Sequence, residues 1–492
     1  MSEDLIGASR ALHYEEPLLW DLPQGDTGGT DWRSVDNKSQ TGLQERESIG
    51  LPDLKEPQVV RHFVRLSTKN YSIDHGFFPL GSCTMKHNPR LNEKLARLPG
   101  FNIHPLQPEA TVQGALALMY ELQDWLAKLT GLPGVCLSPA AGAHGELAGI
   151  MTIARAHEMK GNHHKTVILV PDSAHGTNPA TAAMCGYSIR VIPTKETGRV
   201  TIEAFKEALG DGHDVAGMMV TNPNTCGLFE SDILEISKLL HAAGGYFYCD
   251  GANFNALVGK IRPADFGVDV MHINLHKTFS TPHGGGGPGS GPICVTEELT
   301  PYLPIPTVWK DGDVYKLETL EDRKTSFGRL KAFHGQFGMF VRALSYMKSH
   351  GTDGLRQVSE DAVLNANYIL SQLTDEYHVP YGGPCMHECL LTDKFQKEQG
   401  VSTLDIAKTL IEYGIHPMTV YFPLVLPGTM LIEPTETEDK PTLDRFIAVM
   451  KKIASDVKAM SNDLHANPLS APRKRLDEVT AARQPRLRWK KA

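Results

Sequence analysis

The sequence lacks the features that place a chain in a membrane, on a nucleic acid or outside the cell. No apolar run approaches the roughly 20 residues that a membrane span needs. The first residues, 1–4, are acidic, whereas a secretory signal starts with basic residues. The formal net charge is −8 at pH 7, so the chain as a whole does not attract a nucleic acid or an anionic membrane. We therefore expect a soluble, cytoplasmic protein whose partners are small molecules or other proteins.

The eight cysteines lack the close pairs typical of zinc sites and disulfide-rich scaffolds. Reduced thiols are the simplest interpretation. Cys385, His387 and Cys389 alternate, so on a strand they would share one face and could bind a metal. A structural zinc needs a fourth ligand and usually a second close pair, so we favour a half-buried strand and predict no metal. Cys83 is compatible with a redox-regulatory thiol or with a plain buried cysteine.

The length of 492 residues predicts a major and a minor domain, because the chain is too long for one small core. Residues 1–105 are rich in Pro, Gly and charge and predict an extended arm. Residues 106–335 alternate short apolar segments with amphipathic ones, which is typical of an α/β domain whose sheet is buried on both faces. Residues 336–465 predict a smaller α+β domain. Residues 466–492 form a basic tail, which favours a subunit contact or a solvated tail over a nucleic-acid arm.

The segment pattern predicts the individual elements. The candidate strands of the large domain are 166–170, 188–192, 215–221, 246–249, 270–273 and 293–295. The candidate helices are 112–130, 146–157, 232–242, 337–349, 358–373, 402–413 and 442–457, and 387–392 is a further strand. Ser402 and Asp405 have the spacing of a capping box at a helix start.

Lys277 is the most informative residue, because it follows a candidate strand and precedes the glycine-rich residues 284–291. Ligands of α/β sheets bind at the carboxyl ends of the strands, so its amine can point into a crevice there. A partly desolvated lysine can form a Schiff base with an aldehyde. A lone lysine in such a place is more often structural, and the interpretation depends on its neighbours.

Asp250 is the first such neighbour, since it ends the strand candidate 246–249 upstream of Lys277. A carboxylate there can pair with the ring nitrogen of pyridoxal-5′-phosphate (PLP) and raise its pKa. The protonated ring withdraws electrons from a carbanion. Without the lysine, a turn or helix cap is an equally good interpretation of Asp250.

Further candidate cofactor ligands follow other predicted strands. Gly142 and Ala143 precede a predicted helix, where backbone N–H groups and the helix dipole favour a phosphate. His175 can stack on one face of a flat ring and act as an acid or base, and Ala252 is small enough to let the ring lie close on the other face. Thr225 is a candidate near the 3′-oxygen of the ring.

The glycine-rich residues 284–289 also match the dinucleotide fingerprint G-x-G-x-x-G. They do not join a first strand to a helix, and the apolar residues that follow predict another strand. A flexible loop beside Lys277 explains the glycines better.

Four longer motifs carry a family resemblance: Phe78–Lys86, Ala140–Glu146, Asn274–Gly289 and Leu431–Glu436. They resemble motifs of glycine decarboxylase, the P-protein of the glycine cleavage system. The likeness runs from about residue 60 to the tail. The single-chain members are much longer and have an N-terminal half without the lysine, so by length this chain resembles subunit 2 of the two-subunit form.

The resemblance implies a PLP-dependent transferase of fold type I, the aspartate aminotransferase fold, which decarboxylates glycine. It also implies a heterotetramer with two copies each of this chain and a subunit 1, and a lipoyl-bearing H-protein that accepts the aminomethyl group. Lys277 is then the Schiff-base lysine. His175 or His276 assists proton transfer, and His276 is alternatively a phosphate ligand.

Two alternatives stay open on the sequence alone. One is another fold type I enzyme, an aminotransferase or an amino-acid decarboxylase. Such enzymes commonly carry an arginine for the substrate carboxylate, and Arg356 and Arg445 lie in predicted helices with no evident pocket role. The other alternative is a non-catalytic scaffold subunit, which would not need Lys277 together with Asp250.

Overall fold

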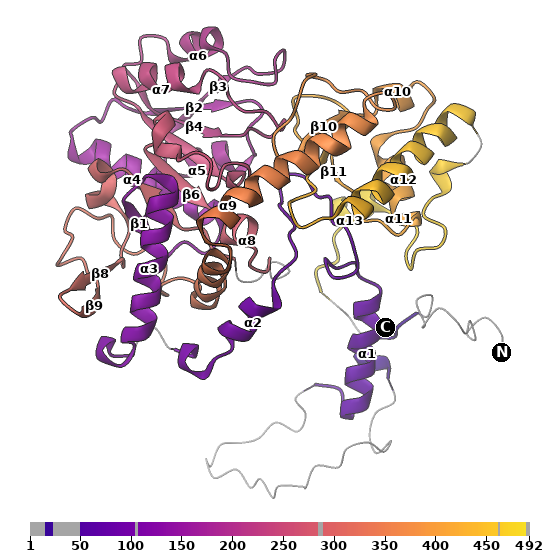
Figure 1. Ribbon diagram of the computed structural model, residues 1–492, viewed down its shortest axis with the longest axis horizontal. Helices are drawn as coiled ribbons and strands as arrows, with labels where there is room; N and C mark the ends of the chain where they lie inside the picture. The colour runs from indigo at the N-terminus through magenta and orange to yellow at the C-terminus, as the bar shows by residue number, and fades with distance from the viewer. Residues whose placement is uncertain (1–14, 23–49, 104–106, 284–288, 461–462, 489–492) are drawn as a thin grey trace, which may run out of the picture. The chain divides into compact units, whose positions relative to one another are not determined.

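The computed structural model describes residues 15–22, 50–103, 107–283, 289–460 and 463–488. Contacts divide the chain into two units (Figure 1), one formed by Gly76–Asn467 and the other by Met1–His75 with Pro468–Ala492. None of the described helices is long and apolar enough to cross a membrane. The glycine-rich residues 284–288 lie outside the described part of the chain.

A seven-stranded sheet organises the larger unit, in the order β1-β7-β6-β5-β4-β2-β3. The strands are β1 (Gly134–Cys136), β2 (Val167–Pro171), β3 (Ser188–Ile192), β4 (Val215–Thr221), β5 (Tyr246–Gly251), β6 (Val270–Ile273) and β7 (Ile293–Val295). Strands β2 to β6 pair in parallel, and β7 pairs antiparallel with both β1 and β6. All six predicted strands are confirmed, and β1 is an addition.

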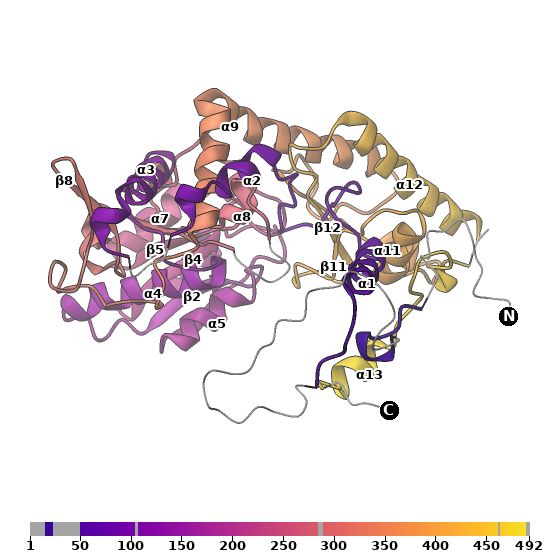
Figure 2. The ribbon, with the colours of Figure 1, turned by 90° about the horizontal axis from the view of Figure 1, so that it is seen from below.

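Helices cover both faces of this sheet (Figure 2). They are α3 (Gln113–Thr130), α4 (Gly142–Met159), α5 (Thr177–Met184), α6 (Ile202–Leu209) and α7 (Ile233–Ala242). Leu169 and Phe247 pack in one apolar cluster with α3, α6 and α7. Their neighbours Ile168 and Tyr248 pack in a second cluster with α4 and α5. Successive strand side chains point to opposite faces, so the continuous apolar runs follow from burial on both sides.

The C-terminal part of the same unit builds a three-stranded antiparallel sheet in the order β10-β12-β11. Its elements are α9 (Phe337–Leu373), β10 (Cys389–Thr392), α10 (Lys394–Lys397), α11 (Thr403–Glu412), β11 (Thr419–Val420), β12 (Thr429–Ile432) and α12 (Lys440–Ala459). The predicted helices 337–349 and 358–373 are the two halves of α9, which is interrupted at Gly351 with φ 63°. The capping box of Ser402 and Asp405 is confirmed.

Several short elements complete the larger unit. They are α2 (Arg90–Ala96), α8 (Leu275–Thr278), the hairpin β8 (Val308–Asp311) and β9 (Val314–Leu317), and the 3-10 helices Pro99–Phe101, Glu109–Thr111, Phe254–Ala256, Pro263–Phe266, Glu297–Tyr302 and Leu464–Ala466. Residues 76–83 pack on the small sheet, where Leu80 bridges to Ile432 and the N–H of Gly81 donates to the carbonyl of Leu431 at 3.2 Å.

The smaller unit contains the 3-10 helix Leu19–Asp21, α1 (Glu56–Thr68) and α13 (Glu478–Arg483). A fully extended arm is therefore wrong for residues 56–68, where the Gln58 side chain accepts a hydrogen bond from the N–H of Lys55 at 2.9 Å and starts the helix. In the basic tail, Arg473 forms an ion pair with Glu15. The predicted boundaries at 105, 335 and 465 stay predictions.

The cysteines that suggested a possible metal site lie in apolar surroundings. Cys385 and Cys389 belong to the core of the C-terminal part, and β10 is buried throughout rather than half-buried. His387 lies near Glu433 instead, with 3.7 Å between its Nε2 and Oε1 of that carboxylate.

Candidate active site

A cavity of about 470 Å³ lies at the carboxyl ends of β4, β5 and β6. Its lining comprises Leu80, Gly81, Ser82, Cys83, Gly142, Ala143, Glu146, His175, Thr177, Thr221, Thr225, Asp250, Ala252, Asn253, His272, Asn274, Lys277, Thr419 and Phe422. Seven of the eight residues selected from the sequence are in this set. The structure brings them together from loops that follow different strands, as expected for a ligand site of an α/β sheet.

Lys277 lies in α8, the single helical turn that follows β6. Its Nζ donates a hydrogen bond to the carbonyl of Ser82 at 2.8 Å. Ser82 belongs to the predicted arm and to its motif Phe78–Lys86, but our reasoning from the sequence assigned it no role in the site. The amine is thus held at the cavity by a residue 195 positions away along the chain.

Asp250 is fully buried on β5 and bonded on both carboxylate oxygens. Its Oδ2 accepts from Nδ2 of Asn178 at 3.0 Å, and its Oδ1 accepts from the N–H of Ala252 at 2.9 Å. Burial opposes ionisation, but His272, these two donors and the charge of Lys277 together hold the pKa of Asp250 below its usual value. The cavity therefore contains a fixed negative charge.

Glu146 on α4 is a site residue that our reasoning from the sequence missed. Its carboxyl accepts from Oγ1 of Thr177 at 2.8 Å and from Nδ2 of Asn178 at 3.0 Å, so Asn178 bridges Glu146 and Asp250. Burial and repulsion from Asp250 raise the pKa of Glu146 to about 7. Glu146 is the last residue of the motif Ala140–Glu146. Its place in that motif was the signal in the sequence that could have identified it as a site residue.

The N-terminus of α4 lies where the sequence predicted a binding site for the phosphate. Gly142 and Ala143 open the helix and line the cavity, and the first N–H groups of a helix have no partner within it. A Cβ on Gly142 would lie 2.8 Å from both side-chain polar atoms of Asn274. A side chain at this position would therefore displace that of Asn274, which also borders the cavity.

His175, Thr225 and Ala252 all border the cavity. Nδ1 of His175 lies 2.8 Å from Oγ1 of Thr177 and 3.2 Å from the backbone nitrogen of the same residue, and these contacts orient the ring at the cavity. Burial, with a smaller contribution from Lys277, lowers the pKa of His175. The hydroxyl of Thr225 donates to the carbonyl of Ser173 at 2.5 Å, so its oxygen can still accept a hydrogen bond.

His276 differs from the other predicted residues, because it is not in the lining of the cavity. Its Nδ1 accepts from the N–H of Ser290 at 3.4 Å, and its ring packs edge-on against His283 with 5.1 Å between centroids. Burial and the neighbouring His283 lower the pKa of His276 to about 3. A neutral His276 is therefore expected throughout the physiological pH range.

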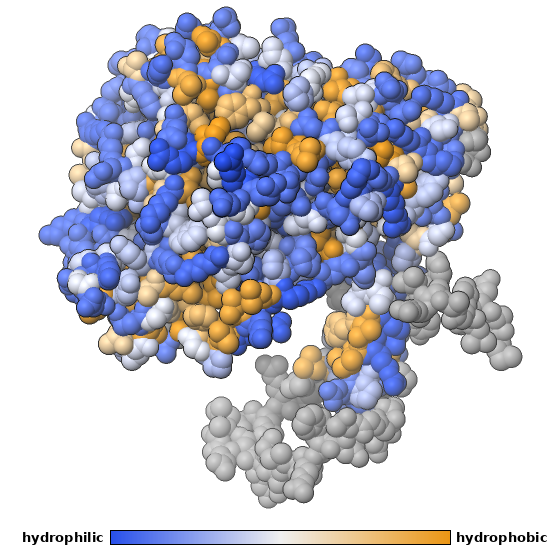
Figure 3. Space-filling model, in the orientation of Figure 1, coloured by the Kyte–Doolittle hydropathy of each residue, from blue (hydrophilic) through white to orange (hydrophobic). Residues whose placement is uncertain are grey.

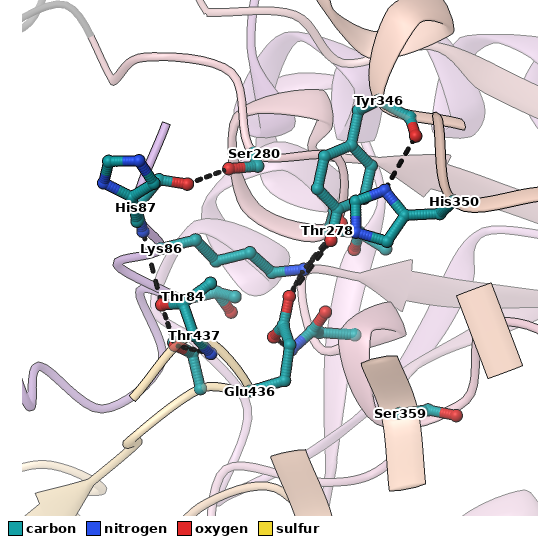
Figure 4. Close-up of polar contacts among 12 residues, drawn as sticks. Thr84, Lys86, His87, Thr278, Ser280, Tyr346, His350, Ser359, Glu436 and Thr437 are labelled. Atoms are coloured by element: carbon teal, nitrogen blue, oxygen red, sulfur yellow. Dashed lines mark hydrogen bonds and ion pairs between the residues drawn. The ribbon is translucent and has the colours of Figure 1, made fainter. Parts of the chain in front are cut away.

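Lys86 contacts α8, the helical turn that contains Lys277 and is called the lysine turn below (Figure 4). Its buried Nζ donates to the carbonyl of Thr278, next in sequence to Lys277, at 2.8 Å and pairs with Glu436 at 2.7 Å. Tyr346 on α9 bonds to both Lys86 and Glu436. This network ties the arm motif, the lysine turn and the loop after β12 together.

Cys83 also borders the cavity. Burial raises the pKa of its thiol, and the charge of Lys277 opposes that rise. A raised pKa reduces the thiolate fraction, which favours the plain buried cysteine over a reactive thiol.

The residues of the cavity fit PLP. They offer an amine, a buried carboxylate and a helix N-terminus, which match the aldehyde, the ring nitrogen and the phosphate of that cofactor. Thr221 Oγ1 and Asn274 Oδ1 are buried polar atoms of the lining that have no hydrogen-bond partner within the described part of the protein. Such atoms are suited to a polar ligand.

The sheet order, the strand-end cavity and this set of groups define a PLP-dependent enzyme of fold type I. Residues 144–305 match the family model of aminotransferase class V, and residues 358–472 match the C-terminal domain of glycine dehydrogenase. The chain belongs to the family of glycine dehydrogenase (decarboxylating) subunit 2.

Two relatives show the extent of this similarity. The chain is 58% identical to the probable glycine dehydrogenase (decarboxylating) subunit 2 of Caulobacter vibrioides, over 99% of this chain and 94% of that protein. It is 53% identical to the probable subunit 2 of Halalkalibacterium halodurans, over 90% and 91% of the two chains.

Solved structures agree on the fold. A crystal structure of glycine decarboxylase (P-protein) of the glycine cleavage system, in inhibitor-bound form, superposes with a TM-score of 0.68 at 21% identity, covering 86% of this chain and 93% of that one. Glutamate decarboxylase of Lactobacillus brevis superposes with a TM-score of 0.64 at 12% identity, covering 84% and 95%.

Proposed function

We propose that this chain decarboxylates glycine with PLP and delivers the remaining aminomethyl group to a lipoyl disulfide on a carrier protein, the H-protein. The observation that carries the proposal is the shared cavity of Lys277 and Asp250 in a chain of the glycine dehydrogenase subunit 2 family. Bound PLP supplies an aldehyde for an amine and a ring that withdraws electrons from the carbon that loses carbon dioxide.

The residues of the chain have separate roles in this proposal. Lys277 offers the amine that holds the cofactor. Asp250, whose pKa is held low, keeps a negative charge for the ring nitrogen. The α4 N-terminus at Gly142 and Ala143 binds the phosphate.

The side walls of the cavity complete the assignment. His175 presents a neutral ring to one face of the cofactor and can assist proton transfer. Ala252 keeps the other face free of bulk, and Thr225 offers an oxygen to the 3′-position. His276 lies in α8 beside Lys277 but does not border the cavity.

The lining argues against the alternative enzymes. None of the described residues that border the cavity is an arginine. Arg356 instead pairs with Glu360 on an exposed face of α9, and Arg445 reaches the carbonyl of Tyr413. The arginine that commonly binds the substrate carboxylate in the alternative enzymes therefore has no counterpart at these positions.

The proposal extends to partners. The family name implies a second subunit, and we propose that it is subunit 1, with two copies of each chain, and that the assembly binds the lipoylated H-protein. Apolar side chains gather over α2 (Figure 3), where Leu91 and Leu98 are half exposed beside a groove that Phe101 and Tyr120 also line. Such a patch is typical of a subunit interface. A cytoplasmic location remains a prediction from the sequence.

The test is isotope exchange between glycine and carbon dioxide in the purified protein with subunit 1. We expect exchange that depends on lipoylated carrier, disappears in Lys277→Ala and persists in Lys238→Ala, a change of an exposed lysine on α7. Transamination of glycine without exchange would identify an aminotransferase instead. Lack of any PLP absorbance in the wild type would favour the scaffold subunit.

A further inference from the structure

The turn that faces Lys277 has an unusual backbone. Ser82 has φ 60° and Thr84 has φ 37°, both in the left-handed region. A β-branched residue such as Thr84 rarely adopts that region, so other groups must hold the turn in place. The turn borders the cavity through Leu80, Gly81, Ser82 and Cys83.

Two buried carboxylates from the C-terminal part hold it. Oε2 of Glu388 accepts from the N–H of Ser82 at 2.7 Å. Oε2 of Glu433 accepts from the N–H of Thr84 at 3.0 Å, and its Oε1 accepts from the hydroxyl of Thr84. Both glutamates are 0% exposed. The peptide between Ser82 and Cys83 is thus fixed on both sides.

This arrangement costs stability, because two carboxyl groups are taken out of water close together. Burial and the nearby Glu433 raise the pKa of Glu388 well above its usual value. Burying two apolar side chains would cost less free energy than burying two carboxyl groups. The two glutamates are therefore better explained by their hydrogen bonds to the turn at Ser82 and Thr84 than by a contribution to folding.

The turn that the two glutamates hold contains the hydrogen-bond acceptor for the Lys277 amine. The carbonyl of Ser82 accepts from Nζ of Lys277 at 2.8 Å. We propose that Glu388 and Glu433 are positioning residues that aim the Ser82 carbonyl at this amine, which keeps the amine beside the cofactor whenever the two are not joined. This role rests on the proposed function of Lys277.

The chain offers variants that separate positioning from mere packing. Glu388→Gln keeps an oxygen that can accept from the N–H of Ser82, whereas Glu388→Ala removes it. Glu433→Ala removes both bonds to Thr84. Asp405→Ala is the matched control, because it removes a buried carboxyl from the capping box of α11, which is not part of the cavity.

The experiment uses the full chain with its partner subunit, stripped of PLP and mixed with fresh PLP. The rate constant for attachment to Lys277 is measured by absorbance and by borohydride trapping at timed intervals. We expect Glu388→Ala and Glu433→Ala to lower it by about ten- to a hundredfold, as misplacement of a reacting group does. Glu388→Gln restores most of the rate, and Asp405→Ala keeps the wild-type rate despite lower thermal stability.

Wild-type rates in folded Glu388→Ala and Glu433→Ala would overturn the inference, and so would a Glu388→Gln variant as slow as the alanine variant. If the alanine variants do not fold, Thr84→Val, which removes one of the two bonds to Glu433, replaces them, and an unchanged rate there has the same meaning. If wild-type protein traps no PLP on Lys277, the proposed function fails first and takes this inference with it.

Discussion

Glu146 provides a quantitative test of the electrostatics of the site. Burial and Asp250 raise its pKa from 4.5 to about 7 in the folded protein. A carboxyl group whose pKa is raised on folding binds its proton more tightly in the folded state. Its contribution to stability is therefore full below pH 4.5 and is lost as the pH rises through 7.

The perturbation is Glu146→Gln, which cannot ionise. For the two pKa values of wild-type Glu146, linkage gives a loss of roughly 2 to 3 kcal/mol of unfolding free energy between pH 5 and pH 8. The glutamine variant does not have this loss. The variant's stability relative to wild type should thus improve by that amount as the pH rises, whatever constant cost the lost bond to Asn178 adds.

The assay is urea unfolding of both proteins without PLP, followed by tryptophan fluorescence at several pH values. Only the difference between the two proteins at each pH is interpreted, so the titrations of groups that do not interact with Glu146 cancel. Parallel profiles for wild type and Glu146→Gln would refute the reasoning, because they would mean that Glu146 titrates normally.

Three further outcomes are expected. Asp250→Ala should weaken PLP binding by about 2–5 kcal/mol in an absorbance titration, because it removes the buried charge for the ring nitrogen, and unchanged affinity would exclude that pairing. Gly142→Ala should lower PLP affinity while the protein stays folded, because its Cβ meets Asn274 at 2.8 Å; normal affinity would mean that α4 does not seat the phosphate. His276→Asn should leave the pH profile of glycine exchange unchanged between pH 5 and 9, since the pKa of His276 is about 3, and a lost inflection would show that His276 titrates in catalysis.

The elements that could be predicted are those with a strong local signal. Strand β4 is a seven-residue apolar run, and α11 starts with a capping box, so both were located from sequence. The hairpin of β8 and β9 and the two-residue β11 were missed, because such short, partly exposed segments have no apolar periodicity. The helix α1 was missed although Val60, Phe63 and Val64 recur at helical spacing, because the Pro, Gly and charged residues of the surrounding segment led us to predict an arm.

The residues of the site likewise divide into those that a local sequence pattern identifies and those that it does not. Lys277 and Asp250 stand at the ends of predicted strands, and their residue types became informative when the two were considered together. The raised pKa of Glu146 and the contact between Ser82 and Lys277 depend on groups that are far apart in sequence. No local pattern reports such contacts, and only the folded chain places them.

The most direct measurement is peptide mapping by mass spectrometry after borohydride reduction of the purified protein with PLP. We expect one reduced phosphopyridoxyl group, attached to the peptide that contains Lys277. A label on Lys86 or on another lysine, or no label in protein that is folded, would contradict it.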